Sequence, residues 1–265
     1  MRTASRGGTG RAVTARCGLV ARGVLYVLTG LLAVRIAFGE SAGEADRQGA
    51  LQTLAGQPFG RVMVWAVGAG LVCMVLWRLS EAVFGAAGPH GDTAGKRLAA
   101  AGRALFYATA AYSVLSFAAG SGGEGSGDEQ SRDITARALQ LPAGQWLVGA
   151  AGIGIAIAGV TIAVRAALRR FRDHLRMGGV SAGWRRAVDF LGVAGGVSRG
   201  AVFAVAGGFA CYAAWTYDPG RARGVDDTLR AFTGTPAGPW LMVAVGVGLM
   251  LFGVFSWAMA RWREV

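Results

Sequence analysis

Three arginines in this chain recur in the same local pattern, which makes them the first candidates for chemistry. Each precedes an aromatic residue by four positions, so the two side chains share one face of a helix. The arginines are Arg22, Arg103 and Arg199, and the aromatic residues are Tyr26, Tyr107 and Phe203. Three guanidinium groups that faced a common axis would form a candidate site for an anion or a lipid headgroup at the cytoplasmic mouth. The plainer interpretation, which we favour, is that each arginine marks the inner end of a helix. Its stem would then reach outward to water and lipid phosphate, well apart from the other two.

The other residue types that carry chemistry do not form a catalytic pattern. His90 and His174 lie in predicted loops, far from any cluster of acids or cysteines. Cys17, Cys73 and Cys211 lack the paired spacing of a metal or redox site. The sequence has no HExxH motif, no CxxC motif and no phosphate-binding loop ending in Gly-Lys-Ser/Thr. We therefore expect a protein that is not an enzyme and that has no catalytic residues, metal site or cofactor.

The elements that must position the arginines are long and apolar. The chain has 265 residues, of which 53% are hydrophobic and 16% charged, and its mean hydropathy is +0.42. Such a composition is too apolar for a soluble domain of this length. Six apolar runs, each long enough to cross roughly 30 Å of hydrocarbon, cover residues 18–38, 61–80, 103–119, 144–164, 198–217 and 239–260. The sequence predicts an all-α integral membrane protein with six transmembrane helices.

The arginine motif also belongs to a larger repeat. A small residue follows each arginine directly and another lies seven positions further on, so both share a helix face suited to close packing. A Pro-x-Gly signature follows 36 to 39 residues after each arginine, at Pro58, Pro142 and Pro236. Between motif and proline, residues 44–54, 133–139 and 226–232 are predicted to form short amphipathic helices on the outer surface. These features predict three tandem αα-hairpin repeats at 15–85, 96–172 and 190–262, after a disordered cytoplasmic N-terminus at 1–14.

A pair of glycines lies in the second half of each repeat, ten and twelve residues after the proline. Near mid-span of a membrane helix, glycine lets a neighbouring backbone approach closely. We therefore predict helix-packing contacts at Gly68, Gly70, Gly152, Gly154, Gly246 and Gly248.

The net charge of +12 is distributed unevenly along the chain. Residues 1–22 carry a net charge of +5 and residues 165–199 a net charge of +6, whereas residues 120–143 carry −2. By the positive-inside rule the basic segments are cytoplasmic. This predicts a multi-pass protein of the bacterial plasma membrane with both termini in the cytoplasm. The expected partners are membrane lipids, through anionic headgroups at the cytoplasmic face, and not nucleic acid. The sequence leaves a protein partner and the oligomeric state open.

Several of these motifs resemble one known family. They are the Arg-Gly-x-x-Tyr motif that begins at Arg22, the segment Gln57-Pro58-Phe59-Gly60-Arg61, and Trp77-Arg78 with Glu81 and Ala82. Together they resemble the bacterial membrane family called domain of unknown function twelve-zero-six. The resemblance covers residues 15–262 and implies three two-helix repeats, but no activity. Our leading hypothesis is a non-enzymatic membrane protein that is structural or interacts with lipids or partners. The alternative is a small transporter or channel with a path along a pseudo-threefold axis.

Overall fold

The computed structural model describes residues 4–39, 45–85, 93–120, 127–175, 180–223, 225–233 and 238–262. Within these ranges the protein is helical and has no β-strand, which confirms the all-α prediction. Six helices are long and apolar enough to cross a membrane. They are α1 (Ala4–Ala37), α3 (Gly60–Phe84), α4 (Ala94–Ala118), α6 (Gly144–Ala167), α7 (Ala182–Thr216) and α9 (Gly238–Trp262). Three shorter helices connect them: α2 (Arg47–Ala55), α5 (Gly127–Leu139) and α8 (Val225–Thr233), with 3₁₀ turns at Arg170–His174 and Pro219–Arg221.

The first helix begins earlier than the sequence predicts. Residues 4–14 belong to α1, so the prediction of a disordered segment at 1–14 is wrong for these residues. Extending a helix that already exists costs little, because each added residue gains a hydrogen bond without a new nucleation step. As a result Arg22 lies in the middle of a helix of 34 residues rather than near its start.

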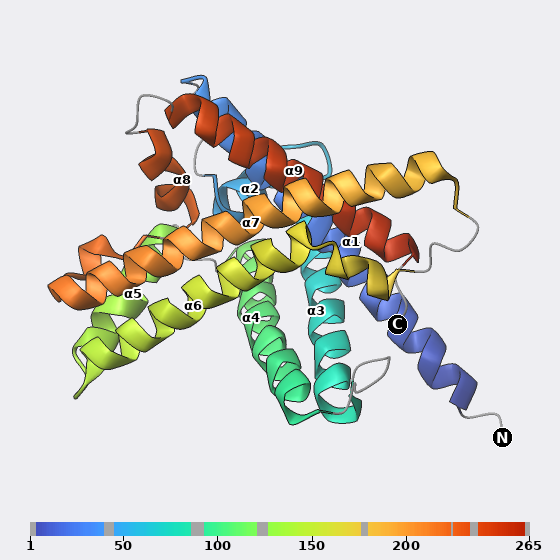
Figure 1. Cartoon of the computed structure of the whole chain (residues 1–265), viewed down its shortest axis with the longest axis horizontal. Helices are drawn as coiled ribbons and strands as arrows, with labels where there is room; N and C mark the ends of the chain where they lie inside the picture. Colours follow the sequence, from blue (N-terminus) through green and yellow to red (C-terminus); the bar gives the residue numbers. More distant parts are fainter. Residues whose placement is uncertain are drawn as a thin grey trace.

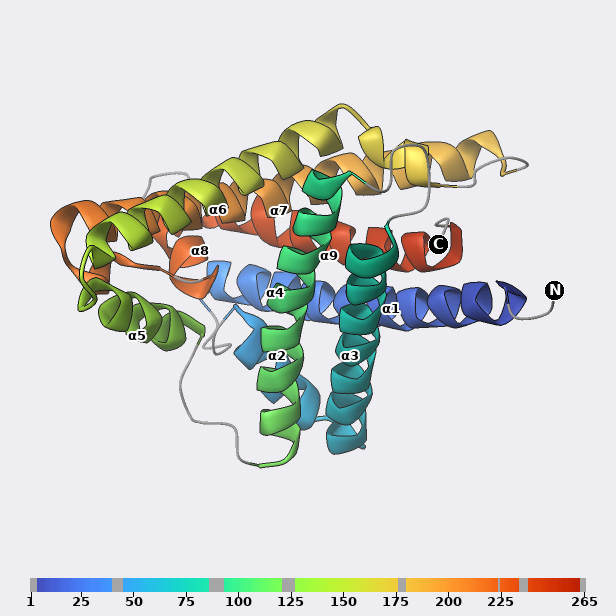
Figure 2. The same ribbon diagram turned by 90° about the horizontal axis from the view of Figure 1, so that it is seen from below.

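The closest helix pairs join different repeats. α3 packs against α4, α6 against α7, and α9 against α1, so the second helix of each repeat lies along the first helix of the next (Figure 1). The third repeat returns to the first, which makes the arrangement cyclic. The pairs cross one another steeply, and the α3–α4 pair stands across the α6–α7 pair (Figure 2).

The small residues of the arginine motif lie in these pairs. A Cβ atom on Gly30 would collide with the carbonyl oxygen of Gly246, and one on Gly207 would lie 2.7 Å from the carbonyl oxygen of Gly152. In the α3–α4 pair, a Cβ atom on Gly68 would lie 2.6 Å from Leu115. The structure thus places Gly68, Gly152 and Gly246 at helix–helix contacts, because the absence of side chains lets the backbones meet.

The helices also meet within a repeat, but only in two of the three repeats. A Cβ atom on Gly70 of α3 would lie 2.5 Å from Ala21 of α1, and one on Gly248 of α9 would collide with Ser198 of α7. The corresponding residue of α6 is Gly154, which has no neighbouring atom within 4 Å. The predicted packing contact at Gly154 is therefore wrong. The reason is that, in the residues described, α4 and α6 do not form a packed pair.

The Pro-x-Gly signature forms the same type of turn in the first two repeats. The residue after the proline, Phe59 or Ala143, has a left-handed backbone with φ of 61°. The next residue, Gly60 or Gly144, lies against a carbonyl oxygen at the end of the preceding short helix, where a Cβ atom would collide. The prolines therefore lie in the turn before the long helix and not in its first turn. The third copy, at Pro236, lies outside the described residues.

The three short helices form at the positions that the sequence predicts for them. Asp46 caps α2 by accepting a hydrogen bond from the backbone N–H of Gly49 at 2.9 Å. Asp226 of α8 accepts a 2.7 Å hydrogen bond from the backbone N–H of Ala45, just before α2. The bond between Asp226 and Ala45 therefore links the connections of the first and third repeats.

Candidate functional site

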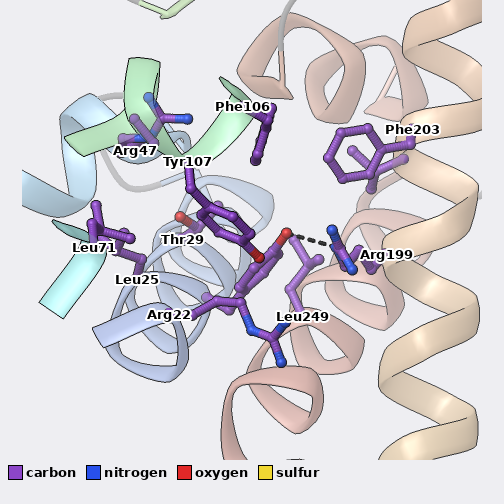
Figure 3. Close-up of a pocket in the computed structure, with 13 residues that line it drawn as sticks. Arg22, Leu25, Thr29, Arg47, Leu71, Phe106, Tyr107, Arg199, Phe203 and Leu249 are labelled. Atoms are coloured by element: carbon purple, nitrogen blue, oxygen red, sulfur yellow. Dashed lines mark hydrogen bonds between the residues drawn. The ribbon is translucent and has the colours of Figure 1, made fainter. Parts of the chain in front are cut away.

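A cavity of about 120 Å³ lies where the first helices of the three repeats meet. We call it the central cavity. Its walls come from equivalent positions of all three repeats (Figure 3). The motif aromatics Tyr26, Tyr107 and Phe203 line it, as do the residues directly before them, Leu25, Phe106 and Val202. A single water molecule needs roughly 10–15 Å³, so the cavity has room for a small ligand group.

Arg22 is the most buried charge at this cavity. Its side chain is 6% exposed, and its Nε–H donates a 3.2 Å hydrogen bond to the hydroxyl of Ser256 in α9. One terminal nitrogen, Nη2, is buried without a hydrogen-bond partner. Burying a charge without a counter-charge or a full set of hydrogen bonds costs several kcal/mol. The arrangement would therefore be stabilised by an anion that accepts from Arg22.

Arg199 reaches the same cavity from the third repeat. Its Nε–H donates a 2.7 Å hydrogen bond to the hydroxyl of Tyr26 in the first repeat (Figure 3). The ring of Phe252 in α9 lies 5.0 Å from the guanidinium carbon of Arg199 and 5.0 Å from that of Arg22. An aromatic face attracts cations, so this ring offsets part of the repulsion between the two like charges.

Arg47 adds a third positive charge from α2. Burial lowers the pKa of its guanidinium from the ordinary value, and the adjacent Asp46 carboxylate opposes this shift. An arginine in a protein nevertheless stays protonated. Among the residues that the structure describes, the lining contains three arginines and no aspartate, glutamate, histidine or cysteine. The cavity is thus electropositive, with apolar and aromatic walls.

The structure brings only two of the three motif arginines together. Our expectation that they point outward and apart is wrong for Arg22 and Arg199, because both lie in the middle of long helices that neighbouring helices cover. Arg103 does not reach the central cavity. It is exposed on α4 and lines a second cavity together with Arg78 and Arg165.

Sequence reasoning missed Arg47 and Phe252 at this site. Arg47 has no equivalent in the other two repeats, so the repeat pattern gives no signal for it. Phe252 looks like any apolar residue of a membrane helix. The repeat pattern could have identified Leu71 and Leu249 as equivalent residues, because both lie thirteen residues after the repeat proline. Both line the central cavity.

The family comparison agrees with this threefold organisation. The chain matches the family described as Domain of Unknown Function (DUF1206) in three successive segments, residues 17–85, 98–169 and 194–263. It belongs to this family. Each matched segment contains one copy of the arginine motif and one pair of long helices, so the family unit is the two-helix repeat.

A bacterial relative extends over almost the whole chain. The chain is similar to the uncharacterized protein YxxB of Bacillus subtilis (strain 168), with 29% identity over 248 residues. The alignment covers 91% of this chain and 87% of the relative. No solved structure matches the chain.

Proposed function

We propose that this protein is a non-enzymatic, multi-pass membrane protein that binds an anionic group in the central cavity. The observation that carries the proposal is the convergence of Arg22 and Arg199 on one cavity, with an unpartnered nitrogen on buried Arg22. Among the described residues, no carboxylate pairs with either arginine, so the positive charge is available to a ligand. Phosphate and carboxylate groups match the guanidinium geometry, because they accept two parallel hydrogen bonds.

The lining favours binding over catalysis. Acid–base or nucleophilic catalysis needs a group that can exchange a proton or attack a substrate near neutral pH. In the described part of the chain, none of the residues that line the central cavity is a histidine, cysteine, aspartate or glutamate. Arginine, tyrosine, threonine and apolar side chains are suited to holding an anion with an apolar portion. A free organic anion and a lipid headgroup share this chemistry.

The test is anion binding to the purified protein in detergent. Isothermal titration with inorganic phosphate, a short-chain carboxylate and a short-chain anionic phospholipid should detect binding of at least one of them. Charge-assisted hydrogen bonds contribute about 1.5–3 kcal/mol each, so R22Q and R199Q should each weaken binding roughly 10- to 100-fold. R16Q is the matched control, because Arg16 is an exposed arginine on the same helix as Arg22. Unchanged binding in both cavity variants would overturn the proposal.

Transport along the axis is a second candidate, favoured by the position of Phe252. This residue contacts both arginines of the central cavity and also lines the second cavity, so it lies close to both. We infer that a smaller side chain there would open a path between the two cavities. If the protein transports its ligand, F252A should raise anion efflux from proteoliposomes above the wild-type rate. Equal efflux from wild-type, F252A and protein-free vesicles would exclude this function.

A further inference from the structure

The second cavity differs from the central one in shape, position and lining. It measures about 410 Å³ and lies between α3 and α4 on one side and α6, α7 and α9 on the other. We call it the lateral cavity. Among the described residues, four arginines line it, namely Arg78, Arg103, Arg165 and Arg170, together with one acidic residue, the exposed Asp173. We propose that the lateral cavity binds the phosphate headgroup of an anionic lipid that enters from the membrane between α4 and α6.

Arg78 provides the buried charge of this site. Its side chain is among the least exposed polar groups of the protein, with 5% of its surface accessible. Its Nη1–H donates a 2.5 Å hydrogen bond to Glu81, and its guanidinium lies 4.1 Å from the ring of Trp77. Its Nε–H is buried and has no hydrogen-bond partner. A phosphate oxygen in the lateral cavity would satisfy this donor, which has no hydrogen-bond partner among the described residues.

The other arginines that line the lateral cavity are Arg103, Arg165 and Arg170. Arg103 extends from α4 and Arg165 from the last turn of α6, and both are exposed. Glu81 is already engaged by Arg78, so it does not neutralise them. Long cationic side chains at the inner end of membrane helices attract anionic headgroups. The charge pattern therefore favours a phosphate-bearing ligand over a cation or a neutral lipid.

The opposite wall of the cavity is apolar. Phe171 and Phe255 meet edge to face, with ring centroids 5.0 Å apart, and Phe252 and Met259 extend this surface. Free phosphate would gain nothing from such a wall. An amphiphile with a charged head and hydrocarbon chains would contact the arginines and the apolar surface at once. This combination identifies a lipid as the source of the phosphate.

The open seam between α4 and α6 supplies the route. In the first and third repeats the equivalent seam is closed by contacts between Gly70 and Ala21 and between Gly248 and Ser198. The second repeat has Gly154 and Gly102 at these positions, and neither has a neighbouring atom within 4 Å. Large apolar side chains on both helices face outward, as expected for contact with lipid. The seam thus connects the lateral cavity with the hydrocarbon around the protein.

The test measures lipid retention by the full-length protein. Native mass spectrometry of the protein released from detergent should show adducts of phosphatidylglycerol in preference to phosphatidylcholine. The double variant R103Q/R165Q should weaken the apparent affinity for phosphatidylglycerol on the order of 10-fold or more. R186Q is the matched control, because Arg186 is exposed and lines neither cavity. Both substituted arginines are exposed, so the variants should fold.

Two further measurements separate the possible outcomes. G154L places a bulky side chain in the open seam and should weaken phosphatidylglycerol binding while the melting temperature stays the same. Inorganic phosphate at millimolar concentration should not displace the lipid. Displacement by inorganic phosphate would show that the site takes a free anion, and equal lipid binding by R103Q/R165Q would show that the lateral cavity is not the site. Either result overturns this inference and leaves the central cavity, tested by R22Q and R199Q, unaffected.

Discussion

Arg199 and Tyr26 lie 173 residues apart in the sequence, and a 2.7 Å hydrogen bond from the Nε–H of Arg199 to the Tyr26 hydroxyl joins them. This bond connects the first helix of the third repeat with that of the first repeat. It also fixes the direction of the guanidinium, whose other N–H groups have no hydrogen-bond partner among the described residues and could bind a ligand. The repeat motif thus uses its aromatic residue to orient the arginine of another repeat.

Removing that acceptor should weaken ligand binding without unfolding the protein. Y26F keeps the ring and its edge-to-face contact with Phe252, whose centroid lies 4.9 Å away. It deletes only the hydroxyl. A hydrogen bond to a charged group contributes about 1.5–3 kcal/mol, and part of this loss should appear as a roughly 3- to 10-fold weaker anion affinity. Titration calorimetry measures the change, and Y212F, at an exposed tyrosine outside the cavity, is the control. A larger effect of Y212F than of Y26F would contradict this role.

Equivalent glycines of different repeats should respond in opposite directions to alanine. At Gly248 a Cβ atom would collide with Ser198, and overpacking of this kind costs about 1–3 kcal/mol. At Gly154 the space is open, and replacing glycine by alanine in a helix stabilises by up to about 1 kcal/mol. Thermal unfolding in detergent should therefore show a lower melting temperature for G248A and an equal or higher one for G154A. Destabilisation of the same size in both would show that the α4–α6 seam is closed in solution.

The sequence predicts much of this architecture, because its signals are local. Apolar length defines the six long helices, and the recurring spacing of Arg22, Pro58 and their copies defines the three repeats. The pairing of helices depends on which neighbouring helix can pack closely against a helix face that carries glycine. From the sequence alone, the helix face that contains Gly30 could pack against α3 or against α9. In the structure Gly30 packs against Gly246 of α9. Helix pairing depends on contacts between residues far apart in the sequence, and a local pattern does not predict these contacts.

The direction of the arginines could not be predicted for a related reason. The apolar run at 18–38 places Arg22 near a helix end, where an arginine side chain can extend to the headgroups at little cost in free energy. The helix actually continues back to Ala4, and α9 covers Arg22 with Ser256 and Phe252. Burial of a charge is decided by these long-range partners. In the second repeat they are missing, and Arg103 stays exposed although its motif is the same.

The link between the short helices α2 and α8 should contribute to stability. Asp226 is 4% exposed, accepts from the backbone N–H of Ala45 and pairs with Arg230 at 2.6 Å. D226A leaves that N–H without its acceptor and should lower the free energy of unfolding by about 1–3 kcal/mol. D226N keeps an acceptor oxygen and loses only the ion pair with the half-exposed arginine, so it should cost less than about 1 kcal/mol.

Denaturant unfolding in detergent checks this order. D218A is the control, because it removes an exposed ion pair with Arg221, which contributes roughly 0–1 kcal/mol, and an exposed hydrogen bond from the backbone N–H of Gly220. The expected ranking of stability is wild-type, then D218A and D226N together, then D226A. If D226A were as stable as D218A, the connection between α2 and α8 would not contribute to the free energy of unfolding.

The orientation in the membrane follows from the charges and can be tested at two exposed positions. Basic residues concentrate in residues 165–199, and from the positive-inside rule we expect this segment and both termini to face the cytoplasm. Gln140, before α6, and Ser181, before α7, are exposed at opposite ends of the α6–α7 pair. In a background without the native cysteines, a membrane-impermeant thiol reagent added to intact cells should label Q140C and leave S181C unlabelled. A permeant reagent should label both, which controls for reactivity. Labelling of S181C alone by the impermeant reagent would invert the topology and place the arginines of the lateral cavity at the outer leaflet.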